Sequence, residues 1–235
     1  MNQKVQNYLK SLRAQKRAEY DKKKSEFLTS QGLYEEVRSP KDSWDEEYPY
    51  SGYDESTEKE AFAMIRFANF ADARAIAAIY AHYVHKTAIT FVAEAPTTAD
   101  FVSRISDPRY PFLVAEKNDR VVGYAYASMF RTKAAYRWDV ELSIYLAPGI
   151  EGQGIGSELM EQLLIEVEKL GYLNVYSCIT MPNDRSVNLH KKFGFEQLGH
   201  FPHSGYKMGQ WHDVIWMGKI LTTPDGAPEE PHLLV

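Results

Sequence analysis

Residues 140–158 read VELSIYLAPGIEGQGIGSE and contain the features around which the fold has to form. The stretch begins as an apolar and hydroxylic run, typical of a buried strand, that carries one acidic residue, Glu141. It continues through a turn into the glycine-rich loop 152–156 and then into a helix. Backbone N–H groups at a helix N-terminus bind anions, and glycines let a phosphate approach the backbone closely. The stretch therefore predicts a strand, a phosphate-binding loop and a helix in succession.

The sequence on both sides of this stretch, residues 63–221, predicts one α+β domain. Apolar runs with period 2 predict strands, and apolar residues at helical spacing predict helices. A polar turn at 117–120 joins two strands in a hairpin pattern. We expect strands at 63–68, 89–92, 111–116, 121–126, 140–146, 174–180, 197–199 and 211–220, and helices at 71–84, 99–106, 156–170 and 184–192. Hairpins followed by a βαβ crossover predict a mixed sheet with helices on its faces, a three-layer α/β/α arrangement.

The segments outside this domain have a different composition. Residues 1–62 combine a basic helical stretch, with roughly five excess positive charges up to residue 31, and an acidic linker with roughly seven excess negative charges. The segment is either a solvated helix on a tethered arm or an arm that binds a partner or a second copy. A basic helix that binds nucleic acid is a further alternative, with less support because the basic part has few aromatic residues. Residues 222–235 contain three prolines and are expected to form a loose C-terminal tail.

Composition excludes several classes of protein. The chain has 235 residues, 44% of them hydrophobic, and a formal net charge of −5, which argues against a general nucleic-acid binder. One cysteine, Cys178, excludes an internal disulfide, and its apolar surroundings predict a buried, inert thiol in a reducing compartment. No apolar run approaches the ~20 residues that a membrane helix needs. We expect a cytoplasmic protein without a metal, because no His/Cys/Asp/Glu group has metal-ligand spacing.

Two features of the opening stretch each allow a functional and a structural interpretation. The glycine loop is either a phosphate site or a plain tight turn, and it fits neither the dinucleotide motif G-x-G-x-x-G nor a nucleotide P-loop. Glu141 lies in a strand that otherwise reads as core, where an unpaired carboxylate is costly. It is either a general base that takes a proton from an ammonium or a structural partner for a nearby arginine or tyrosine.

The strand, the loop 152–156 and the later residues Asn183, Ser186 and His190 with 193–195 (FGF) resemble the GCN5-related N-acetyltransferase (GNAT) superfamily. Within it, residues 63–221 are similar to the phosphinothricin acetyltransferase branch. The matching segments are 64–66, 79–80, 90–91, 123–125, 135–137, 140–141, 181–184, 205–207 and 211–214. Residues 1–62 lie outside the resemblance. The loop departs from the family at Glu151, where relatives usually have Arg or Gln.

The resemblance implies a site for acetyl-CoA between two parallel strands that a bulge splays apart. The backbone of the first strand would bind the pantetheine arm, the loop would bind the pyrophosphate, and the start of the following helix would complete the site. The residues implied are Ile144, Tyr145 and Leu146 on the strand, Gly152, Gln153, Gly154, Ile155, Gly156 and Ser157 in the loop, and Asn183 and Ser186 at the helix.

The resemblance also implies direct transfer in a ternary complex. Glu141 would be the base, a backbone N–H near Ile144 would bind the oxyanion, and His190 would protonate the thiolate or contact CoA, unless it is a structural histidine. The cations of the loop before the base strand would grip an acidic group of the substrate, unless that loop is simply solvated. The expected substrate residues are Arg131, Lys133 and Arg137, with Phe91, Tyr136 and Tyr206 as walls of the pocket.

The predicted function is therefore acetyl transfer from acetyl-CoA to the α-amine of a small amino-acid analogue, such as phosphinothricin or methionine sulfone or sulfoximine, by a homodimer. One alternative is acetylation of another amine, such as an amino-sugar drug or a protein N-terminus. The other is a non-catalytic CoA-binding regulatory module whose N-terminal arm is the interaction element. Glu141 and the basic loop argue against that module, because a mere binder needs neither.

Overall fold

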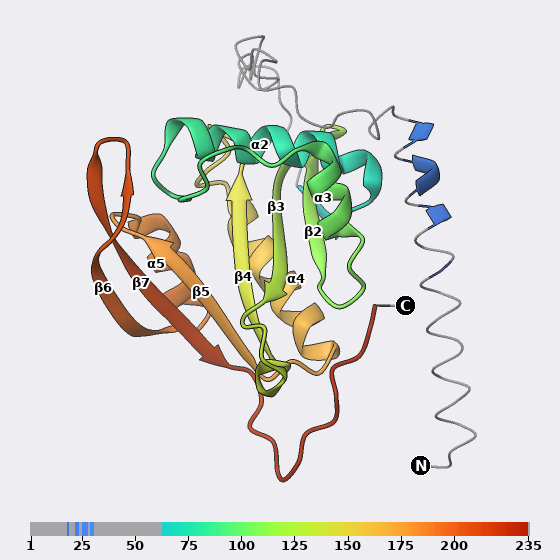
Figure 1. Ribbon diagram of the computed structural model, residues 1–235, viewed down its shortest axis with the longest axis vertical. Helices are drawn as coiled ribbons and strands as arrows, with labels where there is room; N and C mark the ends of the chain where they lie inside the picture. Colours follow the sequence, from blue (N-terminus) through green and yellow to red (C-terminus); the bar gives the residue numbers. More distant parts are fainter. Residues whose placement is uncertain (1–17, 19–21, 24, 28, 31–62, 235) are drawn as a thin grey trace.

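The computed structural model describes residues 18, 22–23, 25–27, 29–30 and 63–234 (Figure 1). Its elements are β1 (Met64–Phe67), η2 (Phe70–Asp72), α2 (Ala73–Lys86), α3 (Thr98–Ile105), β2 (Phe112–Lys117), β3 (Arg120–Met129), η3 (Ala134–Tyr136), β4 (Asp139–Leu146), α4 (Ile155–Lys169), β5 (Asn174–Thr180), α5 (Asp184–Lys192), β6 (Glu196–Lys207) and β7 (Gln210–Ile220).

In residues 63–234 these strands form one seven-stranded sheet in the order β1-β2-β3-β4-β5-β7-β6. Neighbours are antiparallel except β4 and β5, which run parallel because α4 carries the chain back over the sheet. Helices α2 and α3 lie on one face and α4 and α5 on the other (Figure 1). The predicted mixed sheet between two helical layers is confirmed.

Local sequence signals set the ends of the early elements. Thr97 caps α3 in a capping box with Asp100, and Asn69 caps η2 in the same way with Asp72. The hairpin between β2 and β3 turns at Asn118 and Asp119, whose positive φ angles of 52° and 58° suit a two-residue turn between twisted strands. These boundaries agree with the sequence prediction to within a few residues.

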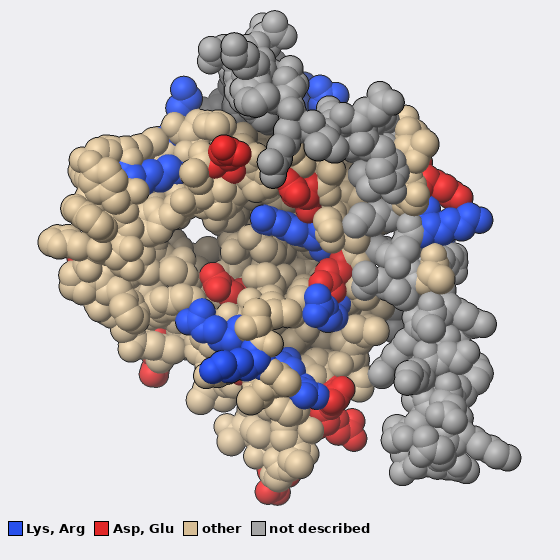
Figure 2. All heavy atoms as spheres, viewed as in Figure 1, with Lys and Arg blue, Asp and Glu red and all other residues tan. Residues whose placement is uncertain are grey.

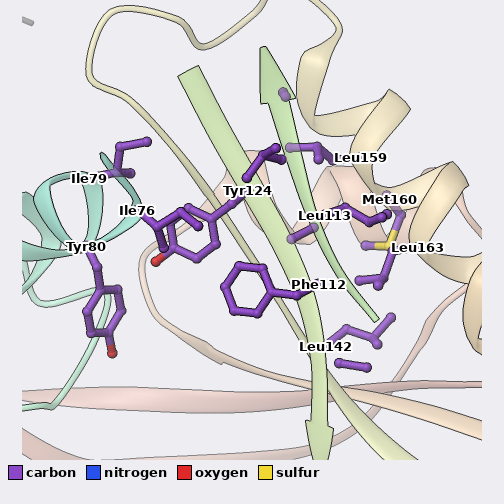
Figure 3. Close-up of a cluster of buried hydrophobic side chains, with 14 of the residues drawn as sticks. Ile76, Ile79, Tyr80, Phe112, Leu113, Tyr124, Leu142, Leu159, Met160 and Leu163 are labelled. Atoms are coloured by element: carbon purple, nitrogen blue, oxygen red, sulfur yellow. The ribbon is translucent and has the colours of Figure 1, made fainter. Parts of the chain in front are cut away.

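The hydrophobic core fills the space on both sides of the sheet (Figure 3). On one side Ile76 and Ile79 of α2 pack towards Tyr124 of β3, and all three are fully buried. On the other side Leu159 and Leu163, two members of the stripe predicted along α4, are likewise fully buried. Because strand side chains alternate between faces, one sheet supplies both halves of the core.

Two predicted strands differ from the structure. The segment predicted as a strand at 89–92 is a loop. Its carbonyl groups accept hydrogen bonds from the side chains of Thr180 and Lys207 instead of from a neighbouring strand. Strand β6 runs over Glu196–Lys207, far beyond the predicted 197–199. It was missed because it is largely exposed and its pairing with β7 is shifted at two places, so the apolar alternation is lost.

Residues 222–234 have no regular secondary structure, as expected for a tail, but hydrogen bonds attach them to the domain. The N–H of His232 donates to the carbonyl of Leu170, and the N–H of Leu234 donates to that of Pro108, both at 2.7 Å. Trp138 Nε1 also donates to the carbonyl of Glu229 at 2.7 Å. The tail is therefore fixed along the C-terminal end of α4. The physical reason is backbone pairing, which the proline-rich composition does not reveal.

Of the predicted N-terminal arm, the described residues 18, 22–23, 25–27 and 29–30 are helical, and the Phe27 ring lies 5.6 Å from that of Phe70. The other residues of 1–62 lie outside the described part of the chain, so the proposed boundaries at 62 and 221 stay a prediction. Among the helices that the structure describes, none is long and apolar enough to cross a bilayer.

Candidate functional site

The parallel strands β4 and β5 pair for only three residues and then separate. Asp139, Val140 and Glu141 are in register with Asn174, Val175 and Tyr176. Strand β4 continues to Leu146 and β5 to Thr180 without further pairing to each other. The backbone ladder stops at Glu141, and Ser177 Oγ still lies 3.3 Å from the carbonyl oxygen of Leu142, so the gap between the strands opens just beyond this contact. The gap lies along the strand for which it was predicted, but nothing in the sequence indicated the residue at which it begins.

Hydrogen-bond alternation decides which groups of β4 face this gap. The N–H of Ala147 donates to the carbonyl of Val122 on β3 at 2.8 Å. In an antiparallel ladder every second residue exchanges such bonds, so the backbone of Tyr145 also points to β3. The backbone groups of Ile144 and Leu146 point to the other side, into the gap. The carbonyl of Leu146 accepts one hydrogen bond there, from the Tyr83 hydroxyl at 2.7 Å.

The glycine loop leads from this gap into α4. Gly152 and Gly154 have φ angles of 86° and 87°, in the left-handed region, and a Cβ added to either would meet nothing within 4 Å. Gly154 is the N-cap of α4, and no side chain caps it. The first N–H groups of an α-helix have no acceptor within the helix, so they remain directed out of this end. Open space and unused donors together fit a phosphate group.

Glu151, the acidic residue that fits a phosphate site poorly, is turned back onto its own loop. Its Oε2 accepts a hydrogen bond from the N–H of Gly149 at 3.0 Å. The same oxygen lies 4.0 Å from a guanidinium nitrogen of Arg185 on α5. A backbone donor and a cation therefore offset part of its negative charge beside the loop.

Two lysines that sequence reasoning missed flank the same loop. Lys192 Nζ donates to Ser157 Oγ at 3.0 Å, and Lys117 Nζ donates to Gln153 Oε1 at 3.2 Å. Their ammonium groups add positive charge next to the open N–H groups of α4. The run of basic residues at the end of α5 was a visible signal for Lys192, whereas Lys117 comes from a hairpin turn far away in sequence.

The side chains of Asn183 and His190 both form hydrogen bonds with the backbone of α5. Asn183 Oδ1 accepts the N–H of Ser186 at 3.2 Å as the N-cap, which leaves its Nδ2 as a donor. The ring of His190 is 5% exposed and packs edge-on to Phe195. Its Nδ1 donates to the carbonyl of Ser186, and its Nε2 bonds Ser177 Oγ, both at 2.8 Å.

Burial lowers the pKa of His190, opposed by the bond to the Ser186 carbonyl. The imidazole is therefore neutral near pH 7, with both nitrogens bound inside the protein. Proton donation to a thiolate would require this ring to leave Ser177. The geometry favours the structural alternative for His190, in which it joins α5 to β5, and the role of acid stays a prediction.

Glu141 lies on the face of the sheet that carries α2. Tyr145, four residues further along β4, contacts the Tyr80 ring of α2 at 5.0 Å, and residues two apart along a strand share a face. Burial raises the pKa of Glu141, and the positive charge of Arg131 opposes that shift. A half-buried carboxylate with a raised pKa at the closed end of the gap has the properties of a general base.

The three predicted substrate cations have different surroundings. Arg131 lies over the rings of Phe130 and Trp216, at 4.6 and 5.6 Å, and acts electrostatically on Glu141. Arg137 is paired with Glu230 of the tail instead. Lys133 is exposed at the start of η3. Figure 2 shows a hollow below α2 with an acidic group inside it and basic side chains along its lower border.

The three predicted pocket walls are also not all brought together. Phe91 packs on Gly205, with its ring 6.2 Å from that of His212. Tyr136 contacts Phe130, which in turn stacks on Tyr176 of β5 at 4.4 Å.

Tyr206 lies apart from both of these aromatic clusters. It is 62% exposed and lies against Trp211. It alternates with Gly205 and Lys207, which face the loop of Phe91, so its side chain points to the opposite face.

The prediction that Cys178 is buried was wrong, because its side chain is exposed. Partial desolvation and the charge of Glu141 raise the pKa of its thiol to about 11, against the effect of Arg131. The thiol stays protonated near neutral pH and is a weak nucleophile, which is a different reason from the one the sequence suggested. Three aromatic residues of this region, Phe130, Tyr176 and Trp216, were not predicted as site residues. The available signal was the alternation of Tyr176, Cys178 and Thr180 along β5, because alternate residues of a strand share a face.

No group of three or more His, Cys, Asp or Glu side chains within the described residues could hold a metal ion.

Comparisons with known proteins show the family to which the chain belongs. Residues 65–216 match the acetyltransferase (GNAT) domain family. Phosphinothricin N-acetyltransferase of Streptomyces viridochromogenes is 37% identical over 170 residues, covering 71% of this chain and 91% of that protein. L-methionine sulfoximine/L-methionine sulfone acetyltransferase of Salmonella typhimurium is 35% identical over 159 residues, covering 65% of this chain and 91% of that protein.

A solved phosphinothricin acetyltransferase from Sinorhizobium meliloti, in complex with acetyl-CoA, superposes with a TM-score of 0.67. It is 36% identical and covers 71% of this chain and 95% of its own.

Proposed function

The chain belongs to the GNAT family of N-acetyltransferases, and from that premise we propose that it acetylates the α-amine of a small amino-acid analogue. The proposed substrates are compounds of the phosphinothricin and methionine sulfone or sulfoximine type, after the relatives that bear those names. Acetyl-CoA supplies the acetyl group, and both reactants are bound together during a direct transfer.

One observation carries the proposal: the gap between β4 and β5 begins at the residue that has the properties of a base. The ladder ends at Glu141, and the backbone groups of Ile144 and Leu146 face the gap just beyond it. A carboxylate at the closed end of a gap that could hold an extended ligand is what direct transfer to an amine requires. A tight turn or a mere binding module needs no base at this position.

The chain fits acetyl-CoA along the length of this gap. Its pyrophosphate would be held by the N–H groups that begin α4 after Gly154, with Lys192 nearby. The pantetheine arm would be held by the gap-facing backbone of β4 and by Nδ2 of Asn183. Such contacts would bring the acetyl group close to Glu141, since the gap closes there.

At the reacting end the residues act on the proton and on the acceptor. Glu141 accepts a proton from the substrate ammonium, so that the amine can attack the thioester carbon with a free electron pair. As the C–N bond forms, the C–S bond breaks, and CoA leaves as a thiolate that then takes up a proton. The N–H of Ile144 is the proposed donor to the oxygen on which negative charge develops. Arg131 binds an acidic group of the acceptor, since its guanidinium is fixed over Phe130 and Trp216 beside the base.

A thiol-release assay over a panel of amines tests the proposal. We expect Glu141→Gln to lower kcat by about 10²–10⁴-fold at neutral pH, while the Kd for acetyl-CoA stays nearly the same. Glu196→Gln, at an exposed position of β6, is the control and should have wild-type turnover. Unchanged turnover in Glu141→Gln would refute the base. An active enzyme that prefers an amino sugar or a peptide N-terminus would refute the proposed acceptor.

The expected homodimer and cytoplasmic location stay predictions. The surface that we propose a second copy would cover is the hairpin of β6 and β7, which exposes six large apolar side chains. These are Leu198, Phe201, Tyr206, Met208, Trp211 and Ile220.

A further inference from the structure

The two halves of the sheet that part at Glu141 are joined again on the α2 face by a short loop. We call residues 89–91 the bridge. Its central residue, Thr90, is 8% exposed, although no strand pairs with it. In Figure 1 the chain leaving α2 turns beside the β6–β7 hairpin before it returns to α3. The bridge therefore runs between elements that belong to different halves of the sheet.

Side chains from both halves hold the bridge. From the half that contains β4, the Tyr80 hydroxyl bonds Thr90 Oγ1 at 2.7 Å, and the Tyr80 ring rests on Tyr145. From the other half, Thr180 Oγ1 of β5 donates to the carbonyl of Ile89 at 3.2 Å. Lys207 Nζ of β6 donates to the carbonyl of Thr90 at 2.7 Å. These bonds cross the opening where the backbone ladder is missing.

The hairpin also makes room for the bridge. The Phe91 ring lies on the backbone of Gly205, where a Cβ would come within 2.2 Å of it. Gly205 does not have a positive φ, so its conformation does not call for glycine. The three atoms nearest to an added Cβ all belong to the ring of Phe91, so this ring excludes a side chain at position 205. The hairpin thus fits the bridge with one residue that leaves space and a second, Lys207, that supplies a bond.

The charge of Lys207 would be a disadvantage if this side chain served only to stabilise the fold. Desolvation lowers its pKa, which means that its surroundings oppose the charged form. A neutral donor such as a serine or a glutamine would hold a carbonyl without that cost. A long side chain with a charged donor is suited to holding a loop at a distance from its own strand.

We propose that Lys207 is a positioning residue that fixes the bridge across the gap and thereby limits the size of the amine accepted beside Glu141. The inference rests on the proposed function, because it assigns the selection of the acceptor to the same site. The bridge passes between α2 and the β6–β7 hairpin, the elements that border the hollow in Figure 2. Loosening it widens the acceptor side and leaves the phosphate end, at α4, as it was.

The test compares Lys207→Met with Lys219→Met. Lys219 is a matched control on β7, because its Nζ also donates to a carbonyl, that of Phe193, at 2.8 Å, but makes no bond to the bridge. Each variant is assayed with a series of amino-acid sulfones whose side chains lengthen by one methylene at a time. In Lys207→Met the ratio of kcat/KM for the longest to the shortest acceptor should rise about tenfold or more.

The same preparation gives a readout besides activity. Hydrogen exchange of the amides in residues 89–91 should be faster in Lys207→Met and unchanged in Lys219→Met. The Kd for acetyl-CoA should stay within about twofold of wild type in both variants. A general loss of structure would instead weaken the binding of both acetyl-CoA and the acceptor amine. If Lys207→Met does not fold, Thr180→Val removes the neighbouring bond to Ile89 at nearly constant volume.

The outcomes separate this inference from the proposed function. A folded Lys207→Met that keeps both the wild-type acceptor ratio and the wild-type exchange overturns it. Equal losses for every acceptor, or a loss of acetyl-CoA affinity of the same size, also overturn it. If the wild-type enzyme acetylates none of the sulfones, the proposed acceptor class fails, and the exchange measurement still decides whether Lys207 holds the bridge.

Discussion

Gly154→Ala tests whether the glycine loop is a phosphate site, because it adds a single methyl group at the N-terminus of α4. Gly154 has a φ of 87°, and the added Cβ would meet nothing within 4 Å. The substitution therefore introduces backbone strain and fills open space without a clash. Gly209→Ala is the matched control, because Gly209 has a φ of 79°, equally open surroundings and a position in the β6–β7 turn.

The expected magnitudes follow from these two properties. An L-residue in the left-handed region costs about 1–2 kcal/mol, so both variants should lose that much stability. For a domain of this size the melting temperature should fall by about 2–8 °C. Gly154→Ala should also lose at least one hydrogen bond from a backbone N–H to a phosphate oxygen. A bond to a charged group is worth about 1.5–3 kcal/mol, so the Kd for acetyl-CoA should rise about tenfold or more.

Thermal unfolding and calorimetric titration with acetyl-CoA measure the two effects separately. The two variants should melt alike, and only Gly154→Ala should bind acetyl-CoA more weakly. If Gly154→Ala melts like the control and keeps the wild-type Kd, the loop is a tight turn and the phosphate site lies elsewhere.

Two further predictions concern buried hydroxyls and the pH dependence of turnover. The Tyr124 hydroxyl is fully buried with no hydrogen-bond partner among the described residues, so Tyr124→Phe should stabilise the protein by about 1–2 kcal/mol in urea unfolding. Tyr80→Phe loses a bond to Thr90 and should destabilise it by about 1 kcal/mol, and equal signs for the two would contradict the reasoning. The charge of Arg131 lowers the pKa of Glu141, so Arg131→Met should raise that pKa and move the acidic limb of the kcat/KM profile to higher pH. An acidic limb that does not move would contradict either the role of Glu141 as the base or the electrostatic effect of Arg131 on it.

Sequence reasoning succeeded for features that depend on neighbours along the chain. The strand, loop and helix around Gly154 occur where they were predicted, because glycine spacing and apolar periodicity report local backbone preferences. The capping box at Thr97 and the hairpin turn at Asn118 are local in the same sense. The order of hairpins and crossover was enough to predict the mixed sheet.

Tertiary structure decided which of the candidate residues are available to a ligand. Arg137 looked equivalent to Arg131 in the sequence, but Glu230, 93 residues away, pairs with it. The side chain of Cys178 is exposed because β4 and β5 part before reaching it, and a strand sequence does not state where its partner ends.

By itself the sequence determined the strand, the glycine loop and the helix, together with a carboxylate at Glu141. The structure alone decided that the ladder ends at Glu141 and that Lys207 reaches Thr90, 117 residues away, across the opening. The physical reason is that backbone preferences act over a few residues. The end of a ladder and the partner of a side chain depend instead on which distant segments pack together.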